Sequence, residues 1–427
     1  MPPFLALIFP VWRPARKPRW RLRQSGPDMT PIRSARPISA SQIRSHADLA
    51  GYDPDLCVIK LGSAVLTTAV GRLDQLVLGS IARFAASRIE RGKATMIVSS
   101  GAVAAGIGQM GLKERPSRVP ELQALAAVGQ SRLMNRWAAA FDAEGHHVAQ
   151  VLVSADDFRD RRRYLNMRYT FEKLFEMGVV PILNENDTVT IDELRFGDND
   201  GLAQLVGIKM LAGLLVFLTS VGGVYRHMPT AGETPELVEV IERVTPEILA
   251  MVSSEKTKVG TGGMGSKLEA ARLASSAGIP VIIAPGKKTG ILSDLLAGKG
   301  GGTLILPAQG AFSDHRYSRR QRFIAFNRVK PQGRLWVDDG AVRALLQGHK
   351  SLLPAGVRRT EGDYERQDLI EIMTPKGEAV ARGLTNYSAN EVQRLMGHRS
   401  TDIGAILGTS DYYDEVIHRD NLVVLNG

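Results

Sequence analysis

Between residues 57 and 308, short apolar runs rich in β-branched residues alternate with longer stretches whose apolar residues lie three to four positions apart. The short runs are typical of strands, and the longer stretches are typical of amphipathic helices. Strands are predicted at residues 57–61, 94–99, 148–153, 179–183, 214–218 and 280–284, and helices within residues 73–91, 122–144 and 165–177. Because crossovers of helical length join parallel strands, the pattern predicts an α/β domain with a mostly parallel sheet sandwiched by helices. In such domains, ligands bind beyond the carboxyl ends of the strands.

The residue composition of the sequence changes near residue 309. Residues 309–332 contain six Lys/Arg and one acidic residue, which predicts a linker between domains, although the apolar run 323–326 has the composition of a strand. From Gly333 onward, glycine-rich turns separate short apolar runs such as 369–373 and 379–384. We therefore assign residues 51–308 to the α/β domain and predict a small β-rich domain with a C-terminal tail over 333–427.

The net charge of +10 over 427 residues is concentrated at the N-terminus. Residues 1–50 hold nine Lys/Arg against two acidic residues, are rich in proline and show no helical or alternating period, which predicts a disordered basic extension. Its apolar segment precedes its arginines, the reverse of a secretory signal. Met29 is an alternative start, so the extension is either a true tail for an acidic partner or a gene-boundary artefact.

Composition excludes several classes of protein. The one cysteine, Cys57, cannot form an intrachain disulfide, and its apolar neighbours favour a small buried side chain over a nucleophile. A reducing cytoplasm fits this cysteine content. No apolar segment approaches the ~20 residues that a membrane helix needs, so no membrane partner is expected.

Residues 106–111 contain the spacing G-x-G-x-x-G, which is the formal signature of a dinucleotide-binding turn. In that motif the glycines open the helix directly after the strand, and an acidic residue follows about 20 positions later. Here Ala126 stands near that position, inside a helical pattern. The sequence therefore favours a glycine cluster that ends a helix over a dehydrogenase site.

Two glycine–lysine segments have the chemistry of phosphate binding. Residues 260–267 are not a Walker A motif, because Ser266 precedes Lys267, but their four glycines allow backbone N–H groups to approach an anion, and a helix begins near Lys267. Lys60 lies near the end of the first predicted strand, two positions before Gly62. A buried lysine needs an anionic partner, although many strands end in a solvated lysine.

A third cluster is acidic and rich in amides. Residues 184–187 (Asn-Glu-Asn-Asp) follow a strand directly, and residues 197–200 (Gly-Asp-Asn-Asp) precede a predicted helix. Turn and N-cap chemistry explains Asp198 well and explains Asp187 and Asp200 less well. Acidic loops beside lysine-bearing, glycine-rich loops are the charge pattern of phosphoryl transfer to a small charged acceptor.

These residues closely resemble the bacterial glutamate 5-kinases, a family of the amino-acid kinase superfamily that has a C-terminal PUA domain. The resemblance runs from about Cys57 to the end of the chain, and its six motifs follow the family order. They lie at residues 58–63, 98–106, 125–131, 184–187, 197–200 and 260–264. In the C-terminal domain, residues 351–356 and 418–421 resemble the PUA part, which distinguishes this family from aspartate, acetylglutamate and uridylate kinases.

The resemblance implies transfer of the γ-phosphoryl group of ATP to the side-chain carboxylate of L-glutamate. By position, Lys60 and Lys267 would flank the transferring group and Asp200 would hold both lysines. The family's glutamate-binding positions match Ser100, Asp187 and Asn199. Its nucleotide contacts match Lys60, Thr219, Ser220, Thr261, Gly262, Gly263, Met264, Gly265, Ser266 and Lys267.

No dedicated metal site is expected, since Mg²⁺ would arrive with ATP and bind mainly through phosphate oxygens and water. Two positions depart from the family pattern. Ser220 stands where the family usually has Asp, and Gly265-Ser266-Lys267 stands where it usually has Ser-Thr-Lys or a close variant. Both lysines and Asp200 are retained, so we expect an active enzyme with altered ATP affinity.

Two other functions remain as alternatives. PUA domains commonly occur on RNA-modifying enzymes, but residues 333–427 hold 11 Lys/Arg and 14 Asp/Glu, which argues against nucleic acid as the main partner. A catalytically silent sensor of glutamate or proline would not need the two lysines. The resemblance also implies a homo-oligomer and feedback by proline, and a cytoplasmic location is expected.

Overall fold

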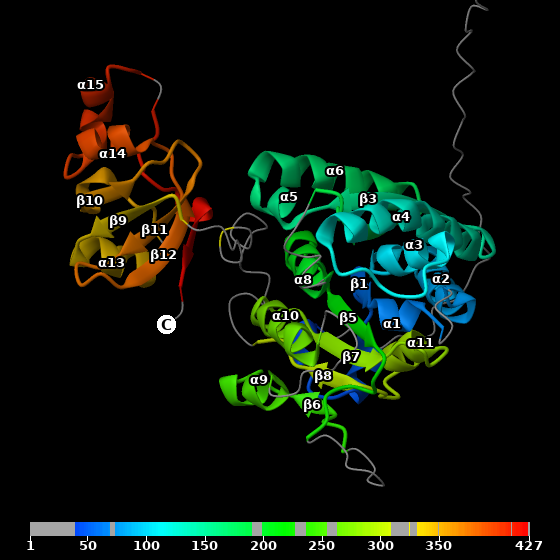
Figure 1. Cartoon of the computed structure of the whole chain (residues 1–427). Helices are drawn as coiled ribbons and strands as arrows, with labels where there is room; N and C mark the ends of the chain where they lie inside the picture. Colours follow the sequence, from blue (N-terminus) through cyan, green and yellow to red (C-terminus); the bar gives the residue numbers. More distant parts are fainter. Residues whose placement is uncertain are drawn as a thin grey trace, which may run out of the picture. The chain divides into compact units, whose positions relative to one another are not determined.

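The computed structural model describes residues 39–68, 73–189, 199–226, 236–253, 263–308, 324, 331–348, 350–410 and 412–425. Within these residues the chain forms two sheets, one from strands between residues 56 and 305 and one from strands between residues 333 and 424 (Figure 1). The predicted α/β class and the predicted β-rich C-terminal domain are confirmed. The domain limits 51–308, 309–332 and 333–427 stay predictions.

The larger sheet has eight strands in the order β3-β4-β2-β1-β5-β7-β8-β6. They are β1 Leu56–Leu61, β2 Ala94–Ser99, β3 His147–Val153, β4 Val179–Glu185, β5 Leu214–Thr219, β6 Val240–Ile241, β7 Val281–Pro285 and β8 Thr303–Ile305. The sheet is parallel from β3 to β7, whereas β8 runs antiparallel to β7 and parallel to β6. All six predicted strands are present. The sequence pattern missed β6 and β8 because strands of two and three residues are too short to show a period.

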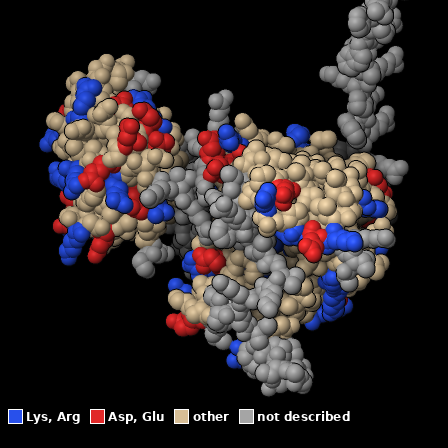
Figure 2. Space-filling view, in the orientation of Figure 1, with Lys and Arg blue, Asp and Glu red and all other residues tan. Residues whose placement is uncertain are grey.

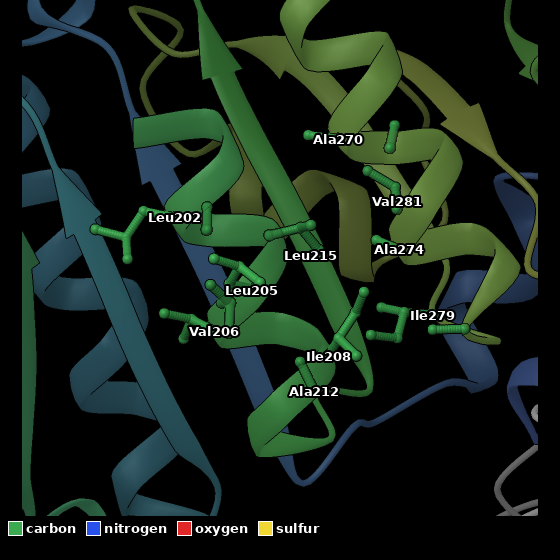
Figure 3. Packing of buried hydrophobic residues seen from close by; sticks show 14 of the residues in the cluster. Leu202, Leu205, Val206, Ile208, Ala212, Leu215, Ala270, Ala274, Ile279 and Val281 are labelled. Carbon is green, nitrogen blue, oxygen red and sulfur yellow. The ribbon is translucent and has the colours of Figure 1, made fainter. Parts of the chain in front are cut away.

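Helices cover both faces of this sheet. They are α1 Ser63–Leu66, α2 Gln75–Glu90, α3 Ala102–Met110, α4 Val119–Asp142, α5 Ala155–Arg159, α6 Arg161–Glu176, α8 Asn199–Met210, α9 Pro246–Ser253, α10 Met264–Ser276 and α11 Ile291–Leu296. Side chains alternate across a strand, so Cys57 and Ile59 of β1 join a core with α2 and α4, whereas Val58 joins a core with α8 and α10. Figure 3 shows part of the second core, where α8 and α10 pack with Leu215 of β5 and Val281 of β7.

The C-terminal domain contains a five-stranded sheet in the order β10-β9-β11-β12-β13. Its elements are β9 Gly333–Val337, α13 Asp339–Leu346, η3 Pro354–Gly356, β10 Val357–Gly362, β11 Leu369–Met373, β12 Ala379–Leu384, α14 Ala389–Leu395, η4 Ser400–Asp402, α15 Ile403–Leu407, η5 Arg419–Asn421 and β13 Leu422–Val424. Neighbouring strands are antiparallel except β9 and β11. A core of its own includes Leu335, Ile370 and Ile417. The predicted strands 369–373 and 379–384 match β11 and β12, whereas the strand predicted at 323–326 lies outside the described residues apart from Ile324.

Residues 39–51 differ from the prediction of a disordered extension over residues 1–50. They form two short 3-10 helices, η1 Ala40–Gln42 and η2 Ala47–Gly51. Ile43 and Leu49 are fully buried in the core that includes α2 and α4, and the ring Nε2 of His46 lies within 3.1 Å of two backbone carbonyl oxygens. Two buried side chains six positions apart give no recognisable period, so the sequence pattern did not reveal this segment. Residues 1–38 lie outside the described residues.

Cys57 is fully buried in β1. Burial disfavours the thiolate and raises the pKa of the Cys57 thiol to about 11. Because a thiol is nucleophilic only as the thiolate, this side chain is inert. The prediction of a small buried hydrophobic residue is confirmed.

Gly106 and Gly111 serve helix packing and helix termination, and a Cβ atom on Gly106 would lie 2.0 Å from the carbonyl oxygen of Leu125 in α4. Gly111 has a φ of 66° and caps the C-terminus of α3, as expected for a glycine cluster that ends a helix. Helices α3 and α4 approach so closely that a Cβ atom on Gly129 of α4 would lie 1.9 Å from the carbonyl oxygen of Ala102. The dinucleotide motif is therefore a coincidence of spacing.

Gly129→Ala is expected to destabilise the fold by about 3 kcal/mol or more, because the clashing atoms belong to the backbone of α3 and cannot rotate away. Gly79→Ala is the matched control, since Gly79 lies in α2 and a Cβ there would meet nothing within 4 Å. The control is expected to stabilise the helix by about 0.5–1 kcal/mol. Urea unfolding of both variants measures the difference, and equal midpoints would contradict the close packing of α3 against α4.

Candidate active site

Lys60 is placed by the alternation of side chains along β1. It follows Ile59 and therefore points to the same face of the sheet as Val58, towards α8 and α10. β1 lies between β2 and β5, so this lysine emerges near the middle of the carboxyl edge of the sheet. Only 2% of Lys60 is exposed. A lysine this deeply buried requires a compensating negative charge.

Asp200 supplies that charge from the first turn of α8. The residue is fully buried, and its two carboxylate oxygens contact different lysines. Oδ1 forms an ion pair with Lys60, and Oδ2 lies 3.1 Å from Nζ of Lys267. The apolar side of α8 packs on β5, which holds the helix start over the end of β1 (Figure 3). The sequence prediction that Asp200 holds two lysines describes this geometry.

Helix α10 brings Lys267 to the same point. The helix begins at Met264 after the N-cap Gly263, so Lys267 lies in its first turn and is 6% exposed. Ser266 donates a hydrogen bond of 2.8 Å from Oγ to Oδ2 of Asp200. The centre therefore brings two ammonium groups to one buried carboxylate, and ammonium groups held in this way can bind an anion.

The other described residues that are predicted to contact the nucleotide lie at the end of β5 and at the start of α10. Thr219 ends β5, the neighbour of β1, and is buried, whereas Ser220 follows it and is exposed. Gly263 is exposed and Met264 and Gly265 are half-buried at the start of α10. Thr261 and Gly262 lie outside the described residues, and contact with the nucleotide stays a prediction for every residue of this set.

Two of the three residues predicted to bind glutamate lie together, next to Asp200. Ser100 follows β2, and Asn199 immediately precedes Asp200 in α8. The amide Nδ2 of Asn199 donates hydrogen bonds of 2.9 Å to Oγ of Ser100 and to Oδ1 of Asn184. Asp187 lies in the turn after β4 and is half-buried. The structure thus joins Ser100 and Asn199 directly, whereas a role for Asp187 at the site stays a prediction.

Two further residues of this hydrogen-bonded group had no role in the sequence analysis. Asn184 is buried in β4 and donates a hydrogen bond of 2.9 Å from Nδ2 to Oε1 of Gln130, a buried residue of α4. Both fall within motifs that carry the family resemblance, residues 184–187 and 125–131. The available signal was a polar amide in an otherwise apolar strand or helix face, which requires a buried partner.

Known proteins match the chain over both domains. The amino acid kinase family matches residues 55–285, which is more than half of the chain. The chain belongs to the amino acid kinase family. The C-terminal domain of this amino acid kinase is a PUA domain, matched over residues 333–407. The family resemblance drawn from the six motifs is confirmed.

Several similar amino acid kinases carry the name glutamate 5-kinase. The protein from Thermoanaerobacter sp. (strain X514) is 43% identical over 368 residues, which is 86% of this chain and 97% of that protein. The protein from Pelobacter propionicus is 45% identical over 368 residues, which is again 86% of this chain and 97% of that protein. The protein from Myxococcus xanthus is 45% identical over 371 residues, covering 86% of this chain and 96% of that protein.

Neither a metal cage nor a membrane helix was found in the part of the chain that the structure describes. Those residues include no group of three or more His, Cys, Asp or Glu side chains that could hold a metal ion. None of the described helices is long and apolar enough to span a bilayer. Binding of Mg²⁺ through the phosphates of ATP stays a prediction.

On the face of the PUA domain that Figure 2 shows, acidic and basic side chains are mixed rather than segregated. Several of its arginines pair with carboxylates, including Arg358 with Asp338 at 2.7 Å and Arg382 with Glu371 at 3.0 Å. A surface that tracks nucleic-acid phosphates needs unpaired basic side chains in a row. This distribution argues against RNA binding as the main function.

Proposed function

We propose that this amino acid kinase transfers the γ-phosphoryl group of ATP to the side-chain carboxylate of L-glutamate, giving γ-glutamyl phosphate and ADP, the first step towards proline. The observation that supports this most directly is the buried centre in which Asp200 pairs with Lys60 and Lys267 at the carboxyl edge of the sheet. The glutamate 5-kinases to which the chain is 43–45% identical over nearly their whole length support the choice of substrate.

The chemistry requires little of the protein besides position and charge. A glutamate side chain has a pKa near ~4.3 and is ionised at neutral pH, so its carboxylate oxygen attacks the γ-phosphorus without a general base. That oxygen forms the new P–O bond while the bond to the β,γ-bridging oxygen breaks, and ADP leaves with the electron pair. No proton needs to move, which fits a centre whose described charged residues are two lysines and one aspartate.

The two lysines would act by stabilising charge. Negative charge spreads over the phosphoryl oxygens in the transition state, and preorganised cations near those oxygens lower the barrier. Asp200 would keep both ammonium groups in place before the nucleotide arrives. Ser100, Asn199 and Asp187 would hold the amino acid, and the start of α10 with Thr219 and Ser220 would hold the nucleotide. Mg²⁺ would supply further neutralisation of the phosphate charge when it arrives with ATP.

The proposal includes several expectations carried by the family resemblance. We expect a homo-oligomer and inhibition by proline. A cytoplasmic location is favoured by the single, buried cysteine.

ADP release is expected with L-glutamate at a rate at least about a hundredfold above that with aspartate, N-acetylglutamate or UMP, because a site that pairs both ends of one acceptor rejects a shorter, blocked or unrelated molecule. A coupled assay with equal concentrations of the four acceptors measures this. Equal rates with all acceptors would contradict the proposed substrate. Tight tRNA binding with a steep salt dependence and no ATP turnover would favour the RNA-binding alternative, and glutamate binding without turnover would favour the silent sensor.

A further inference from the structure

A chain of hydrogen-bonded side chains leads away from the predicted glutamate site. Its first member is the hydroxyl group of Ser100. Three amides follow, Asn199 of α8, Asn184 of β4 and Gln130 of α4, and each hydrogen bond is 2.9 Å long. Asn184 is 3% exposed, and Asn199 and Gln130 are each 8% exposed. A strand and two helices therefore contribute to one line of hydrogen bonds through an apolar core.

The direction of this chain is set by the chemistry of the carboxamide group. Each carboxamide has a donor end and an acceptor end. Nδ2 of Asn199 donates to Oδ1 of Asn184, and Nδ2 of Asn184 donates to Oε1 of Gln130. Rotating one group alone by 180° would place two donors or two acceptors against each other. The three amides therefore keep a common direction or reverse together.

This direction decides which atom Asn199 offers to a ligand. Both hydrogens of its Nδ2 are used, one towards Ser100 and one towards Asn184. Its carbonyl Oδ1 is then the atom left to bind the substrate amino acid. A carbonyl oxygen accepts a hydrogen bond from an ammonium group. The reversed chain would present an N–H donor, which a substrate ammonium cannot use.

Gln130 ends the chain and is the hydrogen-bond acceptor that the observed direction requires. Among the described residues, its Nε2 has no hydrogen-bond partner although the atom is buried. A buried, unpaired donor costs about 1–3 kcal/mol, so the amide is not explained by packing alone. Gln130 makes contact through Oε1, which accepts the hydrogen bond from Asn184.

We propose that Gln130 is a positioning residue that, through Asn184, holds Asn199 with its carbonyl oxygen towards the α-ammonium group of the acceptor amino acid. This inference rests on the proposed function. It deepens that function by making the free amino group of the substrate, and not only its carboxylates, a feature that the site selects. Gln130 itself need not touch the substrate.

The test compares Gln130→Met, which removes the acceptor at similar length, with Gln130→Glu, which keeps an acceptor. Gln109→Met is the matched control, because Gln109 is an exposed residue of the neighbouring helix α3. Two constants are measured by ADP release: the KM for L-glutamate, and the inhibition constant of glutarate, which lacks the ammonium group. Q130M is expected to raise the KM for glutamate about tenfold, which corresponds to about 1.4 kcal/mol, and to leave the glutarate constant and the KM for ATP within about twofold.

Q130E is expected to keep the preference for glutamate over glutarate, since its carboxylate still accepts from Asn184, and Q109M is expected to change nothing. A parallel weakening of glutamate and glutarate in Q130M, with a lower melting temperature, would show a purely structural role and overturn the inference. Loss of the preference in Q130E would overturn it independently, even if Q130M failed to fold. Activity of the unsubstituted chain separates the two claims, because no ADP release with glutamate would overturn the proposed function and this inference together.

Discussion

Lys267→Ala is expected to lower kcat for glutamate phosphorylation about a thousandfold while the KM for glutamate changes by no more than about threefold. Nζ of Lys267 is buried beside Asp200 in the first turn of α10, in the centre that we assign to the transferring phosphoryl group. Removing one preorganised cation from such a centre costs about two to three powers of ten in rate, and more for phosphoryl transfer. Asp200 retains Lys60 as its partner, so the fold should survive the substitution.

Steady-state ADP release with varied glutamate measures both constants, and equilibrium binding of labelled glutamate confirms that the acceptor still binds. Lys113→Ala is the control for loss of a positive charge, because Lys113 is exposed. An unchanged kcat would remove Lys267 from the mechanism. A large rise in the KM for glutamate at constant kcat would instead mean that this lysine binds glutamate.

The fold of the α/β domain could be predicted from the sequence because its central strands are buried on both faces. Runs such as Leu56–Leu61, in which every residue is buried, stand out against amphipathic helices whatever the details of packing. The same reasoning failed where an element is too short to have a period. β8, with three residues, and the 3-10 helices before Tyr52 owe their positions to tertiary contacts, such as burial of Ile43 and Leu49.

The site could be predicted only as a set of residue types at strand and helix ends. Lys60, Asp200 and Lys267 are charged residues in apolar surroundings, so each required a partner, and the family order of the motifs paired them. Their convergence on the two oxygens of one carboxylate needed coordinates. The amide chain through Asn184 and Gln130 could not be predicted, because a buried amide indicates only that it has a partner and not which residue that partner is. Identifying the partners required the coordinates, since Asn184 and Gln130 are 54 positions apart in the sequence.

Asp200→Asn is expected to destabilise the α/β domain by about 3–5 kcal/mol and to abolish measurable turnover. The carboxylate is fully buried and contacts two lysines that are also buried, so its neutralisation leaves two like charges close together in a water-poor place. Removing one partner of a buried ion pair typically costs this much, because the remaining charge has lost its compensation. Thermal unfolding should show a melting temperature lower by about 10 °C.

Asp294→Asn is the matched control, since Asp294 pairs with Lys288 and Lys299 near the surface, where such pairs contribute about 0–1 kcal/mol. Combining Asp200→Asn with Lys60→Met removes one of the two crowded charges and is expected to recover part of the lost stability and none of the activity. That combination separates the two roles of the carboxylate, because folding responds to the net buried charge whereas catalysis requires both lysines in place. A double variant no more stable than Asp200→Asn alone would mean that the single substitution acts through something other than uncompensated charge.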